Sequence, residues 1–374
     1  MADSDLEARR YHRRQLVLSL VGFVLTVAVL VAWLATGTAA ALADALAVRL
    51  PWRAGVVALM LAAVGGSAAV LTFPLDVLSG YVLPRRAGLL SQSVAGWLAD
   101  KAKAAALGGV LGLLAFELFY VLLAWSPTRW WLWSAGVLAA ASVLLAAVVP
   151  VWIVPLFYRL TPLEDATLRA RLLALAERAG VHAAEVSVAD FSRKGRTANA
   201  AVVGLGRTRR ILVSDTLLGG FPPEEVEVVL AHELAHHARG HLPKGLGVQV
   251  VLLVAVFALA HGGLTAGIAP LGLRDAADPA GLPWLVLLLS SLGVLVAPLG
   301  AAWSRRLERE ADAAALEVTR APGAFVAAME RLGRLNLAER RPSRLKELLF
   351  ATHPSLEERI ATAQALERSL AGAT

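Results

Sequence analysis

The chain has 374 residues, of which 57% are hydrophobic and 17% charged, and its mean hydropathy of +0.62 argues against an entirely water-soluble protein. The absence of cysteine excludes disulfides, thiolate metal ligands and a cysteine nucleophile. The formal charge of +7 lies largely beside apolar segments, so we interpret it as a topology signal and predict no nucleic-acid partner.

Long apolar segments dominate the chain. Each of them exceeds the roughly 20 residues that a helix needs to cross a bilayer, and buried helices of soluble proteins rarely stay uncharged for so long. The sequence therefore predicts a polytopic membrane protein with about six transmembrane helices, near residues 15–43, 54–75, 104–128, 130–158, 245–273 and 280–304.

Basic residues gather at alternate ends of these spans, which predicts the orientation of the chain. They precede the first span, separate the second from the third and follow the last, as shown by Arg9, Arg10, Arg13, Arg14, Arg85, Arg86, Lys101, Lys103, Arg305, Arg306 and Arg309. The positive-inside rule places both termini, and the segment between spans four and five, in the cytoplasm. The alanine- and arginine-rich composition without cysteine favours a bacterial plasma membrane, with membrane lipid as a partner.

The predicted spans divide the chain into four parts. Residues 1–158 form an N-terminal membrane region with four spans, and residues 245–304 form two further spans. The parts 159–244 and 305–374 are predicted to be cytoplasmic.

The first cytoplasmic part shows alternating helix and strand patterns. Apolar residues at helical spacing predict a helix over Leu163–Ala179, and Glu185–Ala189 alternates like a strand. Asn199–Val203 and Ile211–Ser214 flank Gly204, Gly206 and a basic turn, which predicts a β-hairpin. Pro222, Pro223 and two glutamates then open another helix.

That helix carries the sequence His232-Glu233-Leu-Ala-His236. At 100° per residue the two histidines are about 40° apart on one face, where both imidazoles can bind one metal ion. Glu233 lies beside them and can act on a water molecule as a general base instead of binding the metal. Zinc suits this arrangement because it is redox-inert, Lewis-acidic and bound well by imidazole.

A catalytic zinc needs a third protein ligand and one open position. His237 and His241 lie about 140° and 180° round the helix from His232 and cannot join the same site, so we expect both to cap or anchor the helix end. Glu308 is the better ligand candidate, and Asp312, one turn later, can orient a ligand histidine. Because spans five and six border the two motifs, the site is predicted at the cytoplasmic membrane face.

Several motifs together resemble the CAAX prenyl protease type 1 family of integral-membrane zinc proteases and, more distantly, the shorter bacterial stress-response membrane proteases. The resemblance extends from about Phe73 to Ile360, with one span fewer before the zinc helix than in the eukaryotic members. The matching segments are His232–His236 with Gly240-His241, Glu308-x-x-Ala311-Asp312, Asn199-Ala200 with Gly204-Leu-Gly, Asp215-Thr-Leu-Leu, and Thr352-His353-Pro354-Ser355 with Arg359-Ile360.

This resemblance implies one Zn²⁺ per chain on His232, His236 and Glu308, in a zincin-like α+β domain with a small sheet. It implies that Asn199, Ala200 and the strand they begin hold the substrate backbone as an added β-strand. It also implies that His353 and Arg359 face the site and stabilise the tetrahedral intermediate.

We therefore predict a zinc metalloendopeptidase whose substrates are peptides or membrane-protein termini, including membrane-associated or lipidated ones, as in CAAX processing. Within the same enzyme class, the alternative is a membrane-protein quality-control protease without prenyl specificity. A catalytically silent membrane scaffold with structural zinc is a second alternative, although such a site needs no residue like Glu233. A transporter is disfavoured because the sequence has no paired repeats with broken helices.

Overall fold

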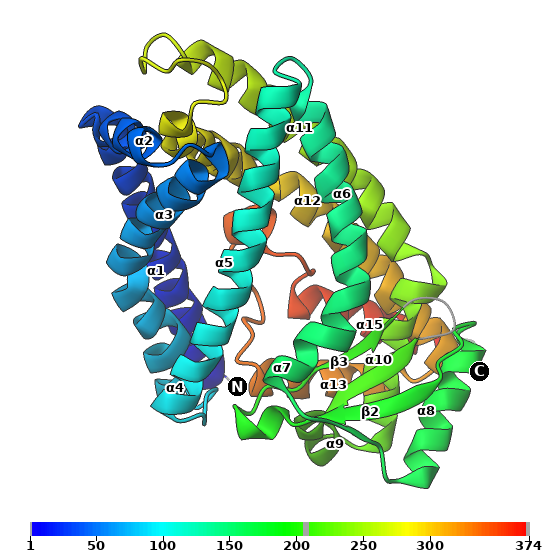
Figure 1. Ribbon diagram of the computed structural model, residues 1–374. Coiled ribbons are helices and arrows are strands. Elements are labelled where there is room, and N and C mark those ends of the chain that lie inside the picture. Colours follow the sequence, from blue (N-terminus) through cyan, green and yellow to red (C-terminus); the bar gives the residue numbers. More distant parts are fainter. Residues whose placement is uncertain (1, 205–208, 372–374) are drawn as a thin grey trace.

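The computed structural model describes residues 2–204 and 209–371, which are mainly helical with one small sheet, as predicted (Figure 1). Within these ranges six helices are long and apolar enough to cross a membrane, which confirms the number of predicted spans. They are built on α1 (Ala2–Ala35), α3 (Arg53–Val77), α5 (Val94–Trp125), α6 (Trp130–Val148), α11 (His241–Gly267) and α12 (Leu282–Thr319).

The first predicted span, 15–43, was wrong at its C-terminal end. Helix α1 ends at Ala35, and a separate helix α2 (Thr38–Arg49) begins after Gly37, whose φ is 70°. Glycine adopts this left-handed conformation without strain, and the helix cannot continue through it. Hydropathy missed the break because the residues on both sides are uncharged. At 12 residues, α2 is too short to cross a bilayer.

Two membrane helices extend through wide π-helical turns toward the sheet. Helix α3 passes through Leu78–Val82 into α4 (Leu83–Arg86), and α6 passes through Val149–Ile153 into α7 (Val154–Phe157). Prolines at or next to these turns remove backbone N–H donors, which accounts for the departure from α-helical geometry.

The sheet has four strands in the order β1-β2-β4-β3. Strands β2 and β4 are parallel, whereas β1–β2 and β3–β4 are antiparallel. The antiparallel pair confirms the predicted hairpin, although Gly206 and the rest of its turn, 205–208, lie outside the described residues. The strands are β1 (Leu160–Pro162), β2 (Glu185–Ala189, as predicted), β3 (Ala200–Val203) and β4 (Arg210–Ser214).

Helices cover the sheet and enclose an apolar core. The predicted helix 163–179 begins later, at Ala166, because the Asp165 side chain caps it by accepting a hydrogen bond from the Leu168 backbone N–H. The helices of this part are α8 (Ala166–Arg178), α9 (Asp215–Gly220), α10 (Pro223–Ala238), α13 (Pro322–Leu335), α14 (Arg344–Phe350) and α15 (Leu356–Ala371), with a 3₁₀ turn at Phe191–Arg193. Another 3₁₀ turn, Pro279–Gly281, leads into α12 in the membrane region. Buried residues of the sheet, α8, α10, α13 and α15 form one continuous cluster.

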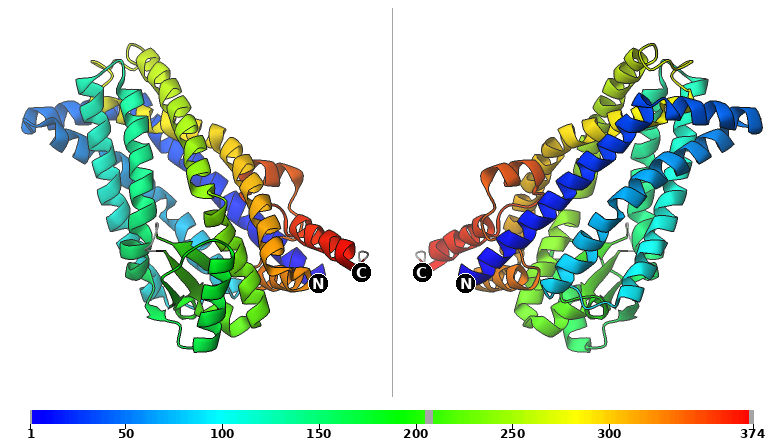
Figure 2. Two further views of the ribbon diagram at one scale, coloured as in Figure 1. Left: turned by 90° about the vertical axis from the view of Figure 1, so that its right-hand side faces the viewer. Right: turned by 90° about the vertical axis from the view of Figure 1, so that its left-hand side faces the viewer.

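Helix α12 joins the membrane region to this domain. It has 38 residues in all, ends well past the predicted end of the last span at 304, and packs against α11 and α10. Figure 2 shows that both termini lie at the end of the molecule that carries the sheet. Because α12 packs against α10, the residues of α12 that follow the apolar segment lie beside α10.

Candidate metal centre

Helix α10, which carries the two histidines of the motif, is held in place by several contacts. Pro223 occupies its first turn together with two acidic residues, which suit a helix start. Glu225 is buried and pairs with Arg331 of α13, with Nε 2.9 Å from Oε2. Most of the apolar side chains of α10 belong to the domain core. The backbone at His232 and His236 is therefore held from several sides.

His232 and His236 meet Glu308 of α12 in a compact, largely buried group. The two Nε2 atoms are 3.3 Å apart, and Glu308 oxygens lie 3.1 Å from that of His232 and 3.5 Å from that of His236. Ligand atoms of a tetrahedral zinc site with bonds of about 2.0–2.1 Å are about 3.3–3.4 Å apart. Both the spacing and the donor types therefore fit zinc, with a fourth position left for water or substrate.

Asp312 lies behind His232, on the side away from Glu308. Its Oδ1 is 2.8 Å from His232 Nδ1, so the carboxylate accepts a hydrogen bond from the ring nitrogen that does not face the metal position. Burial lowers the pKa of His232, but the hydrogen bonds to Asp312 and Glu308 outweigh it and raise the pKa to about 9. Burial lowers the pKa of His236 to about 4. Without metal, the two histidines therefore differ in charge near neutral pH.

Glu233 lines a cavity of about 400 Å³ beside the metal group. Asn199, Ala200, His353 and Arg359 line the same cavity, so the fold brings together predicted residues from both parts of the chain that lie outside the predicted spans. Burial raises the pKa of Glu233. Among the described residues its carboxylate has no hydrogen-bond or ion-pair partner. It is therefore free to accept a proton from water in the cavity.

His353 and Arg359 both contact carboxylates of the metal centre. His353 lies between α14 and α15, and its Nδ1 is 2.7 Å from Glu308 Oε2 although its side chain is 59% exposed. Arg359 of α15 binds Asp312 through two nitrogens, at 2.6 and 2.8 Å. The Arg359 guanidinium is therefore directed at the group that supports His232.

Strand β3 is an edge strand of the sheet, and it contacts α10. The backbone N–H of Asn199 donates to Ser214 Oγ, and the Asn199 carbonyl accepts from the backbone N–H of Ser214. These two bonds fix the register of β3 against β4. In this register the backbone groups of Ala200 and Val202 face the open edge. His237 Nε2 donates to the Val202 carbonyl at 2.9 Å, so His237 anchors α10 to β3 as expected.

The predicted position of His241 on the far side of the helix was wrong, although among the described residues the group of three candidate metal ligands does not include it. Helix α10 ends at Ala238, Gly240 adopts φ 64°, and His241 begins α11. The angular estimate of 180° assumed a continuous helix and does not apply across this break. His241 is buried, and its Nδ1 lies 3.0 Å from Nδ1 of His236. Gly240, a common helix stop, was the signal in the sequence that pointed to the break.

Comparisons with known proteins agree with this geometry. Residues 162–367 match the model of peptidase family M48, and residues 3–159 match the model described as CAAX prenyl protease N-terminal, five membrane helices. The metalloprotease YhfN of Bacillus subtilis is 29% identical over 304 residues, which are 80% of this chain and 71% of that protein. CAAX prenyl protease 1 of Saccharomyces cerevisiae is 31% identical over 174 residues, but these are only 46% of this chain and 38% of the yeast protein.

The fold has a counterpart among solved structures. The crystal structure of S. mikatae Ste24p matches with a TM-score of 0.85 and 23% identity, covering 97% of this chain and 89% of that chain. Its match extends over the membrane helices as well as the sheet. Fold, site and relatives together define a membrane-embedded metalloprotease. Because the matched segment 162–367 is more than half of the chain, the protein belongs to peptidase family M48.

Proposed function

We propose that this protein is a zinc endopeptidase that cleaves peptides, or the exposed ends of membrane proteins, at the cytoplasmic face of the membrane. The observation that carries the proposal is the triangle of His232, His236 and Glu308 next to the unpartnered carboxylate of Glu233. A structural zinc site needs no such carboxylate, whereas peptide hydrolysis requires a base for the attacking water.

The proposed roles follow from the positions of the side chains. When bound, zinc supplies Lewis-acid chemistry that polarises a carbonyl and makes water acidic near neutral pH. Glu233 accepts the proton of the attacking water and passes it to the leaving amine. Asp312 holds the ring of His232, and His353 and Arg359 supply donors near the reacting carbonyl. The open edge at Ala200 aligns the substrate backbone, with Asn199 lining the same cavity.

A second cavity supports substrates that arrive from the membrane. It measures about 700 Å³ and extends from His236 and Glu308 to Val143 and Ala146 of α6 and Leu246 of α11. One end of this cavity is therefore at the metal group, and its walls are made by membrane helices. Membrane-protein termini, including lipidated ones of the kind named in CAAX processing, fit such a site.

The deciding experiment replaces the proposed base without disturbing the metal ligands. Glu233→Gln should keep one zinc per chain and lose hydrolysis of an unfolded test protein by about 10²-fold or more. Glu224→Gln makes the same chemical change at the exposed start of the same helix and should leave activity unchanged. If Glu233→Gln cleaves as fast as the unaltered protein, the proposed base is wrong. Zinc binding without cleavage by the unaltered protein would favour the silent scaffold.

A chelator tests the metal itself. Removal of zinc should abolish hydrolysis, and stoichiometric zinc should restore it. Hydrolysis that persists in metal-free protein would contradict the proposed function.

A further inference from the structure

The two candidate histidine ligands are supported by different chemistry. His232 Nδ1 faces a carboxylate, that of Asp312, at 2.8 Å. His236 Nδ1 faces a second imidazole, that of His241, at 3.0 Å. The rings of His236 and His241 meet edge to face, with centroids 4.9 Å apart and planes 79° apart. In the described part of the chain, no other side chain is hydrogen-bonded to Nδ1 of His236.

The position of His241 depends on the break between two helices. Gly240 has φ 64° and separates α10 from α11, so His241 lies in the first turn of α11 and not on the far side of α10. It is only 4% exposed. A buried imidazole is costly unless its nitrogens find partners. Among the described residues, Nδ1 of His241 finds a hydrogen-bond partner in His236, whereas its Nε2 does not have one.

The hydrogen bonds specify the tautomers of both rings. A neutral His236 that binds metal through Nε2 carries its proton on Nδ1. That N–H points at His241 Nδ1, which must therefore present a lone pair and carry its own proton on Nε2. The Nε2 atom of His241 lies 3.5 Å from Glu310 Oε2, and Glu310 is itself held by Lys244 at 3.1 Å. One hydrogen bond therefore joins His236 to His241, and the Glu310 carboxylate, which is near His241 Nε2 without a hydrogen bond to it, favours a proton on that nitrogen.

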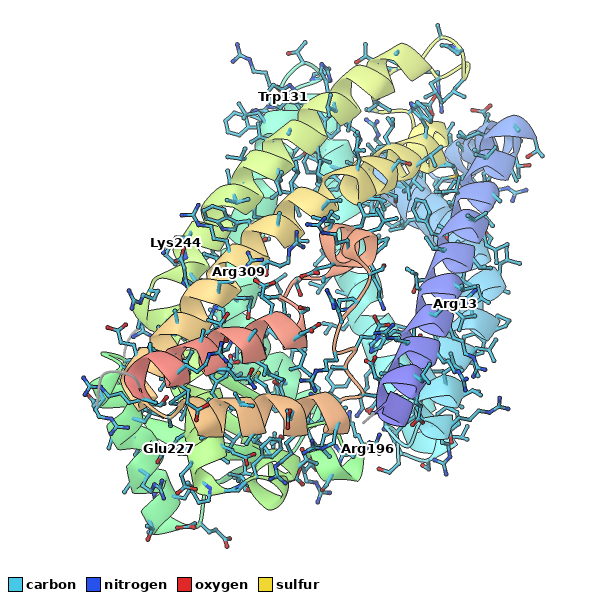
Figure 3. All side chains as sticks on the ribbon, turned by 180° about the vertical axis from the view of Figure 1, so that it is seen from behind. Arg13, Trp131, Arg196, Glu227, Lys244 and Arg309 are labelled. Atoms are coloured by element: carbon cyan, nitrogen blue, oxygen red, sulfur yellow. The ribbon has the colours of Figure 1, made fainter. Side chains whose placement is uncertain are left out.

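We propose that His241 is a positioning residue for the metal centre: its Nδ1 lone pair fixes the ring orientation and tautomer of His236, while the nearby negative charge of Glu310 favours a proton on His241 Nε2. This inference rests on the proposed zinc site. Partners behind a ligand histidine commonly change metal affinity by about 10–100-fold. Figure 3 shows Lys244, which pairs with Glu310, on α11 beside α12.

The test is the zinc dissociation constant, measured by competition with a chelator in the full-length protein in detergent. His241→Phe keeps a ring of similar size but offers no acceptor, and it should weaken zinc binding by about 10–100-fold. His241→Asn offers a carbonyl oxygen near the position of Nδ1 and should restore most of the affinity. Glu310→Gln should weaken binding less than His241→Phe, because its effect passes through His241.

Two further readouts separate positioning from packing. The thermal unfolding of the zinc-free His241→Phe protein should match that of the unaltered protein, and the visible spectrum of the Co²⁺-loaded variant should shift because the ligand ring is reoriented. Equal zinc affinities for His241→Phe and the unaltered protein would overturn the inference, as would failure of His241→Asn to restore binding. If the unaltered protein binds no zinc, the proposed function itself fails, which is a separate outcome.

Discussion

Asp312 Oδ1 lies 2.8 Å from His232 Nδ1, so a carboxylate of α12 supports a candidate ligand of α10 across 80 positions of sequence. The same carboxylate group is held by Arg359, 47 positions further along the chain, through two hydrogen bonds. Asp312 thus contacts both His232 and Arg359. Asp312 is therefore the central member of the group.

Replacing Asp312 should weaken zinc binding. Asp312→Ala removes the acceptor for His232 Nδ1–H and leaves the buried Arg359 without its partner, so we expect zinc affinity to fall by about 10–100-fold. Competition with a chelator measures the change. Glu317→Ala, also on α12 but with a side chain that is 72% exposed, is the matched control and should bind zinc normally. Unchanged zinc affinity in Asp312→Ala would contradict the role of Asp312 in supporting His232.

Zinc affinity should rise with pH. His232 has a pKa of about 9 in the metal-free protein and must lose its proton before Nε2 can bind metal. Below that pH, each unit of increase makes deprotonation easier and should raise the apparent affinity by about tenfold. His236, with a pKa of about 4, is already neutral and adds no slope near neutral pH. Measurements of the zinc dissociation constant between about pH 6 and 8 test this predicted rise in affinity. A flat profile would show that His232 is not the proton-competing ligand.

Removing His353 should slow the reaction without releasing zinc. Its Nδ1 contacts Glu308, but its side chain is 59% exposed and it lies outside the group of three ligands. We expect His353→Ala to lower kcat by about 10²–10³-fold, as for loss of a donor near a developing oxyanion. Zinc content and steady-state kinetics are measured together. His182→Ala, at a histidine that is 64% exposed, should match the unaltered protein. Loss of zinc from His353→Ala would instead assign it to metal binding.

The open edge of β3 can be tested with proline. Ala200→Pro removes a backbone N–H that faces the edge, where proline is tolerated, so the sheet should still form. If that N–H binds substrate backbone, kcat/KM should fall by about tenfold, which corresponds to one hydrogen bond. Ala200→Val keeps the N–H while enlarging the side chain and is the control for size. Equal losses in both variants would attribute the effect to steric bulk.

The absence of native cysteine permits a direct test of topology. Single cysteines at Glu164, before α8, and at Thr128, between α5 and α6, lie at opposite ends of the predicted spans. In intact cells a membrane-impermeant thiol reagent should label Thr128→Cys and leave Glu164→Cys unlabelled. Both positions should be labelled after the membrane is permeabilised. The reverse pattern in intact cells would invert the proposed orientation.

Local patterns in the sequence predicted much of the fold and of the site. The number of spans, the strand Glu185–Ala189 and the β3–β4 pair follow from hydropathy and alternation, which depend only on neighbouring residues. The one-turn spacing of His232 and His236 placed both on one face of α10. The boundaries were less accurate because caps and glycine breaks, as at Asp165 and Gly37, shift helix ends without changing composition.

The sequence by itself determined which side chains can bind a metal and that they border long apolar segments, because residue type and helical period are local properties. Only the tertiary structure decided how residues distant in sequence face one another. Glu308 reaches the histidines because α12 continues past the apolar segment and packs on α10. His241 joins His236 because one glycine turns the chain between α10 and α11. Such contacts depend on the packing of whole helices, which no local pattern contains.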